Sequence, residues 1–149
     1  MKKTTVLTGI ALLAAAVGLS GKSPVEPVNR DRNNVAVKGY DVIAYFEKGQ
    51  PVKGSARFAH SWNGSVWQFE SERTRNLFAA NPAKYAPQFG GYCAWAVSNN
   101  YTADIDPEAW KIVDGKLYLN YSKSVQKKWE ADLYKRIGDG DRNWPGLHK

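Results

Sequence analysis

The sequence predicts one small α+β domain with short antiparallel hairpins, several short helices and a C-terminal amphipathic helix. The length of 149 residues suits a single domain. Two pairs of β-prone runs flank an Asn-Gly and an Asp-Gly dipeptide, which are typical of tight hairpin turns. Towards the C-terminus, apolar residues recur every four positions, which indicates one face of a helix. These are Val125, Trp129, Leu133 and Ile137.

Residues 1–21 have the features of a secretory signal peptide. Lys2 and Lys3 precede an apolar run over residues 6–19, and the small residues Ser20 and Gly21 offer a cleavage point. The run is shorter than the ~20 residues that a membrane-spanning helix needs. We therefore expect a periplasmic or secreted bacterial protein with no membrane span after cleavage. An uncleaved anchor is the alternative.

Residues 22–34 contain two prolines and show no hydrophobic periodicity, so we expect a flexible N-terminal arm ahead of a domain over residues 35–147. Residues 35–37 suit a short strand. Asp41 is a good N-cap for a helical turn through Tyr45.

A hairpin is expected next, formed by residues 56–62 and 66–71 around the Asn-Gly turn. Ser71 then caps a helix that runs to Ala80, and Pro82 begins a second short helix.

The segment "FGGYCAWAV" combines a Gly-Gly break with a run that suits either a helix or a strand. We favour a helix over residues 93–97. The Asp-Pro-Glu sequence at residues 106–108 predicts a helical turn with proline at its first position.

A second hairpin is expected over residues 110–121, turning at its Asp-Gly dipeptide. Residues 138–149 are expected to form a tail that carries His148. Trp144 is expected to dock back onto the domain.

Composition excludes several function classes. The net charge of +7 is scattered and interleaved with acidic residues, so we expect no nucleic-acid partner. A single cysteine, Cys93, rules out an internal disulfide and a Cys-x-x-Cys redox motif. No nucleophile elbow, phosphate-binding loop or dinucleotide fingerprint occurs. A binding protein is therefore expected ahead of an enzyme, with a catalytic pair of Cys93 and His60 left open.

Several motifs together resemble the YHS-domain proteins, and specifically their exported bacterial branch. They are "GYDVIAYF", the hairpin pattern W-N-G-x-x-W-x-F-x-S, the pattern F-x-x-x-P-x-x-Y, "GGYCA" and "WKIVDGKLYLN". The resemblance covers roughly residues 35–147. It implies an accessory or binding module, because the wider family is associated with heavy-metal handling, often beside copper transporters and sensors.

Metal-type members of that family carry three cysteines, whose thiolates suit soft metals such as Cu(I). The corresponding positions here are Ala44, Glu70 and Thr74, none of which offers a thiolate. The family's soft-metal site is therefore not expected in this chain. A transition-metal ion such as copper remains a candidate cofactor only through Cys93 and His60, which are too few for a closed site.

Cys93 is the main candidate for function, because an unpaired thiol in an exported protein must be hidden or used. We expect its loop to border a pocket for a small ligand or metal ion, with Tyr92, Trp95, Tyr40 and Asp41 around it. Packing and capping roles are the alternatives for these residues.

Two other functions remain open. Cys93 could serve a single-thiol redox protein, which requires a lowered thiol pKa. The domain could instead be a structural or protein-interaction module, with no ligand and an exposed aromatic patch.

Overall fold

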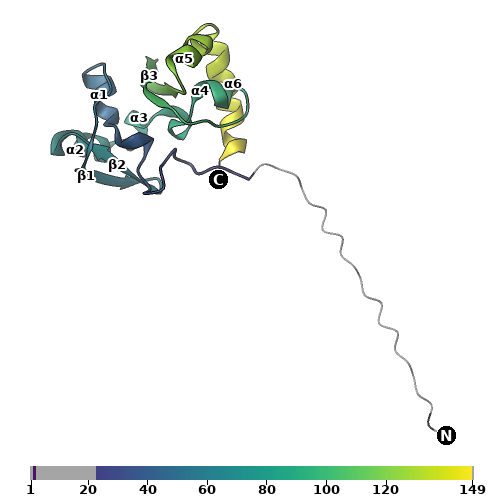
Figure 1. Cartoon of the computed structure of the whole chain (residues 1–149), viewed down its shortest axis with the longest axis horizontal. Helices are drawn as coiled ribbons and strands as arrows, with labels where there is room; N and C mark the ends of the chain where they lie inside the picture. The colour runs from purple at the N-terminus through teal and green to yellow at the C-terminus, as the bar shows by residue number, and fades with distance from the viewer. Residues whose placement is uncertain (1, 3–22, 149) are drawn as a thin grey trace.

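The computed structural model describes Lys2 and residues 23–148, so the predicted signal peptide lies, except for Lys2, outside the described residues. The described chain has the predicted α+β architecture, with two antiparallel two-stranded sheets. Figure 1 shows α1, α2, β1 and β2 gathered on one side and β3, α4, α5 and α6 on the other. We call these the N-terminal half (residues 35–85) and the C-terminal half (residues 88–148).

The predicted caps begin the helices of the N-terminal half. The Asp41 carboxylate accepts a hydrogen bond from the backbone N–H of Ile43, and the Ser71 hydroxyl accepts one from that of Thr74. The elements of this half are the 3-10 turn η1 (Val37–Gly39), helix α1 (Val42–Glu47), strands β1 (Ser55–Trp62) and β2 (Ser65–Phe69), and helices α2 (Glu72–Ala80) and α3 (Pro82–Tyr85).

In the C-terminal half Cys93 is the N-cap residue of a short helix, which confirms the helix expected there. The elements of this half are the 3-10 turn η2 (Gln88–Gly91), helix α4 (Ala94–Ser98), strands β3 (Asp106–Val113) and β4 (Lys116–Asn120), and helices α5 (Lys123–Glu130) and α6 (Leu133–Leu147).

No helix among residues 23–148 has the length and apolar character needed to cross a membrane.

Both hairpin turns form at the predicted dipeptides. Asn63 and Gly64 have φ of 51° and 76°, and Asp114 and Gly115 have φ of 51° and 75°. Two consecutive positive φ angles match the twist of the flanking strands, and Asn, Asp and Gly adopt them most readily.

The helical turn predicted at residues 106–108 is wrong, because this segment begins β3. Asp106 pairs with Asn120, and the register of the ladder shifts between Asp106 and Trp110. Pro107 lies in this irregular stretch, where its missing N–H removes no regular ladder bond. The Asp106 carboxylate accepts from the backbone N–H of Glu108 and so forms a local turn. The residues of this turn have the same sequence pattern as the start of a helix.

The strand predicted at residues 35–37 is reduced to isolated bridges, which join Val35 to Val66 and Ala36 to Arg30. The chain then leaves the extended region, because Val37 has φ of 41° and Lys38 has φ of 59°. A positive φ is strained for a β-branched residue, so tertiary packing must hold Val37 in place.

The apolar face predicted at the C-terminus is present, but two helices carry it. Asp132 separates them with φ of −140° and ψ of 52°. Trp129 is fully buried, and Leu133 and Ile137 pack against the same cluster. The tail expected over residues 138–149 is wrong, because α6 continues to Leu147.

Helix α6 docks closely because Gly140 has no side chain. A Cβ atom at Gly140 would lie 2.5 Å from Cζ of Phe89. The Phe89 ring lies with its centroid 5.9 Å from that of Tyr118 and 6.3 Å from that of Trp144. Trp144 therefore docks onto the domain as predicted, from a helix.

A flexible arm is expected over residues 22–34, but the described part of it, residues 23–34, lies along the domain. Val28 is buried in the core. The backbone N–H of Asn29 donates to the carbonyl of Gly90 at 2.8 Å, and Val25 forms a parallel bridge with His148. This segment thereby connects to both ends of the C-terminal half.

A buried carboxylate ties together three elements of the N-terminal half. Asp41 is fully buried. Its Oδ1 accepts from the backbone N–H of Ile43 at 2.9 Å, while Oδ2 accepts from the N–H of Glu70 at 3.0 Å and from the hydroxyl of Thr74 at 2.8 Å. The ends of α1, β2 and α2 thus meet at one side chain.

Replacing this carboxylate should destabilise the domain strongly. Asp41→Ala removes the cap of α1, leaves the backbone N–H of Glu70 without its acceptor and leaves the Thr74 hydroxyl only its bonds to Ser71, so the free energy of unfolding should fall by about 2–3 kcal/mol. Urea denaturation measures the change. Ser71→Ala, which removes one ordinary cap, should cost only about 1 kcal/mol. Equal losses in the two variants would contradict the central role of Asp41.

Two glycines of α6 should respond oppositely to alanine. Gly138→Ala should raise the free energy of unfolding by about 0.5–1 kcal/mol, because alanine restricts the unfolded chain and nothing but the end of the Arg142 side chain lies near the new methyl group. Gly140→Ala should lower it by about 1–3 kcal/mol, because the methyl group overlaps the Phe89 ring. Thermal or urea unfolding of both variants tests the docking of α6, which a gain at Gly140 would contradict.

Candidate functional site

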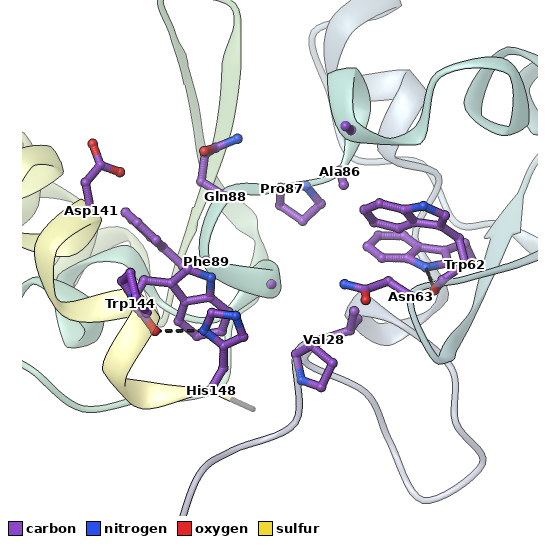
Figure 2. Close-up of a pocket in the computed structure, with 15 residues that line it drawn as sticks. Val28, Trp62, Asn63, Ala86, Pro87, Gln88, Phe89, Asp141, Trp144 and His148 are labelled. Atoms are coloured by element: carbon purple, nitrogen blue, oxygen red, sulfur yellow. Dashed lines mark hydrogen bonds between the residues drawn. The ribbon is translucent and has the colours of Figure 1, made fainter.

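A cleft of about 300 Å³ lies between the β1–β2 turn and helix α6 (Figure 2). One wall comes from the N-terminal half and the other from helix α6, and residues 86–90, where the chain passes from one half to the other, form its floor. The lining residues are Pro27, Val28, Trp62, Asn63, Trp67, Ala83, Ala86, Pro87, Gln88, Phe89, Gly90, Asp141, Trp144, Pro145 and His148.

The first wall is built on a pair of indoles. Trp67 is buried, and its ring lies 5.7 Å from that of Trp62 at an angle of 57°. The indole N–H of Trp67 donates to the backbone carbonyl of Trp62 at 3.0 Å, which fixes the pair. Phe78 supports both rings from behind. Asn63 follows in the exposed turn.

The second wall is a stacked pair on α6. The rings of Trp144 and His148 lie 4.2 Å apart and are nearly parallel, at 12°. Nδ1 of His148 lies 2.8 Å from the carbonyl oxygen of Trp144. Because a carbonyl only accepts, Nδ1 carries the hydrogen, and Nε2 of the neutral ring is left as an acceptor. Asp141 lies one helical turn before Trp144, on the same side of the helix.

The floor is a strained turn that only particular residues tolerate. Phe89, Gly90 and Gly91 have consecutive φ angles of 58°, 62° and 80°. A Cβ atom at Gly90 would lie 2.2 Å from the carbonyl oxygen of Pro27. Backbone strain of this kind often accompanies binding sites.

No lysine or arginine is among the residues that line the cleft, although the chain has 21 of them. The charged side chain in the lining is Asp141. The cleft therefore disfavours anionic ligands.

Cys93 lies in a different place, at the base of a second pocket of about 230 Å³. Its thiol is buried, and the backbone N–H of Tyr121 donates to Sγ at 3.2 Å. Burial raises the pKa of the Cys93 thiol above its ordinary value, although backbone N–H groups of Ala96, Tyr121 and Trp95 oppose this. The pocket is lined by Cys93, Trp95, Tyr101, Ala103, Tyr121 and Val125.

Of the residues expected around Cys93, Trp95 lines the same pocket. The guanidinium of Arg136 lies over the Trp95 ring, 4.1 Å from its centroid. Tyr92 packs instead on Trp144, with ring centroids 5.9 Å apart, and burial raises its pKa. Neither residue is among those that line the large cleft.

The other expected residues belong to the N-terminal half. Asp41 makes the buried capping network described above, and Tyr40 lies under the ammonium of Lys53, 5.2 Å from the ring centroid. His60 meets Phe78 edge-on from strand β1. Residues 23–148 contain no group of three or more His, Cys, Asp or Glu side chains that could hold a metal ion.

Sequence reasoning missed the large cleft. Its walls come from three segments that are far apart in the sequence. The only parts of them that the sequence predicts are the W-N-G turn and the docking of Trp144. His148, expected in a tail, is instead part of the second wall because α6 extends to Leu147.

No protein-family model, curated protein or solved structure matches this chain.

The buried thiol predicts a pH dependence of stability. The pKa of the Cys93 thiol is higher in the folded protein than in the unfolded chain. The neutral thiol therefore contributes fully to the free energy of unfolding below the ordinary thiol pKa of about 8.5, and this contribution is lost as the pH rises through the folded-state pKa. The difference in free energy of unfolding between the wild type and Cys93→Ala should therefore shrink at alkaline pH. Urea denaturation from neutral to alkaline pH measures it.

A thiol reagent provides the complementary measurement. Native Cys93 should react only as fast as the protein unfolds, and at once in urea. Rapid reaction of the native thiol at neutral pH would contradict its burial.

Proposed function

We propose that this chain is an exported small-ligand-binding module whose ligand lies in the aromatic cleft between its two halves. The observation that carries the proposal is the cleft itself, with aromatic rings on both walls and polar side chains among them. Sites for small molecules are typically concave and largely apolar, with a few polar groups that set orientation.

The polar groups of the cleft are available to a ligand. The side chains of Asn63, Gln88 and Asp141 make no hydrogen bond to another described residue, and Nε2 of His148 makes none either. Polar groups without internal partners at the edge of an apolar surface are suited to ligand recognition.

Export and membership of the YHS-domain family are part of the same proposal. Both rest on the sequence motifs alone. The Cys93 segment retains a role, because its first residues, Gln88 to Gly90, form the floor of the cleft.

A protein-interaction module is the second candidate, and one observation favours it. Tyr101 and Tyr121 both line the Cys93 pocket, yet they remain 42% and 59% exposed. Exposed tyrosines beside a hollow are typical of binding surfaces. The single-thiol redox alternative has less support, because burial raises the pKa of the thiol.

Four probes test binding in the cleft: indole, tetramethylammonium, methyl β-D-glucopyranoside and inorganic phosphate. In NMR spectra of the full folded domain, at least one of the first three should shift the indole N–H signals of Trp62 and Trp144. Phosphate should not, because no cationic side chain lines the cleft.

A filled cleft provides the matched control. Ala83 is an exposed cleft residue, and Ala80 is an exposed residue outside it. Ala83→Trp should weaken binding at least about tenfold by occupying the site, while Ala80→Trp should leave it unchanged. The proposal fails if no probe shifts these signals, or if both variants bind as the wild type does.

A further inference from the structure

The lining of the cleft restricts the charge of its ligand. Asp141 is the charged lining residue, and no lysine or arginine balances it. An anion would meet a carboxylate without a counter-charge, which is unfavourable. The ligand class is therefore neutral or cationic.

The walls restrict its shape. Trp144 and His148 stack face to face, so the pair borders the cleft with its outer faces and edges, and Trp62 lies across the cleft (Figure 2). Such surfaces accept a compact ring that presents apolar C–H groups to them. The volume of about 300 Å³ is at the small end of the range for ligand sites, which suits one or two rings.

The polar groups then separate neutral from cationic ligands. Asn63 and Gln88 each offer a donor and an acceptor on one amide, and Asp141 offers two acceptor oxygens. Neighbouring hydroxyl groups, which both donate and accept, match this set. A quaternary ammonium ion has no hydrogen-bonding group and would gain nothing from either amide.

We infer that the cleft binds a saccharide ring, either free or at the end of a glycan, with its C–H face against Trp62 or the outer side of the Trp144–His148 stack and its hydroxyl groups bonded to Asn63, Gln88 and Asp141. This rests on the proposed function, because it names the ligand class of the same cleft.

Methyl β-D-glucopyranoside, N-acetyl-D-glucosamine and cellobiose are the probes, with mannitol as an open-chain polyol of similar hydroxyl content. At least one sugar should shift the indole N–H signals of Trp62 and Trp144 in the full folded domain. Mannitol should not, because it has no ring face to stack. Tighter binding of cellobiose than of the monosaccharides indicates the end of a glycan, and equal binding indicates a free sugar.

Two turn variants give a matched control for the hydrogen bonds. Asn63→Gly removes the amide while glycine retains the positive φ, so sugar affinity should fall about fivefold. Asp114→Gly introduces glycine at the corresponding position of the other hairpin turn, outside the lining of the cleft, and should bind as the wild type does. Asp141→Asn should weaken tetramethylammonium binding more than sugar binding.

The outcomes distinguish failure of the saccharide inference from failure of the proposed function. If indole or tetramethylammonium binds in the cleft while all three sugars fail, the cleft is a ligand site and the saccharide inference is overturned. Mannitol binding as well as the sugars, or no effect of Asn63→Gly, also overturns it. If no probe binds, both proposals fail.

Discussion

The contact between Phe89 and Gly140 determines where the last helix lies against the rest of the molecule. Phe89 lies in the strained turn η2, at the start of the C-terminal half, and Gly140 lies inside the final helix. Only a residue without a side chain allows the helix to approach the ring this closely. The approach sets the position of Trp144, which packs on the same ring, and so the position of the wall that carries His148. The cleft exists because this one contact fixes its second wall.

Local chemistry explains which elements the sequence predicts correctly. The caps at Asp41 and Ser71 and the turns at Asn63-Gly64 and Asp114-Gly115 depend on residues that are neighbours in the chain. The errors arise where tertiary pairing prevails. Asp106 has the local features of a helix start, yet pairing with Asn120 draws it into a strand with an irregular register. The break at Asp132 leaves the spacing of the apolar residues intact, so periodicity alone cannot reveal it.

The candidate site could be predicted only in part, for a physical reason. Cys93 is a candidate from sequence alone because a thiol has distinctive chemistry wherever it lies. In the structure its sulfur is buried and accepts from the backbone N–H of Tyr121. The cleft has no such marker. Its tryptophans, amides and carboxylate are ordinary residues whose significance comes from their proximity, and that proximity depends on long-range packing. Phe89 and Gly90 connect the two sites, because they lead to Cys93 in the sequence and form the floor of the cleft in the structure.

The bridge between Val25 and His148 has a consequence for the order of assembly. It joins the two ends of the described chain, next to the cleft. During synthesis, which begins at the N-terminus, the hairpin turns and the Asp41 network find their partners close in sequence, but the core around Phe69 and Phe78 also needs Leu117 and Leu119 from β4. The second wall waits for the last helix. The core is therefore complete only after β4 has been made, and the cleft only after α6.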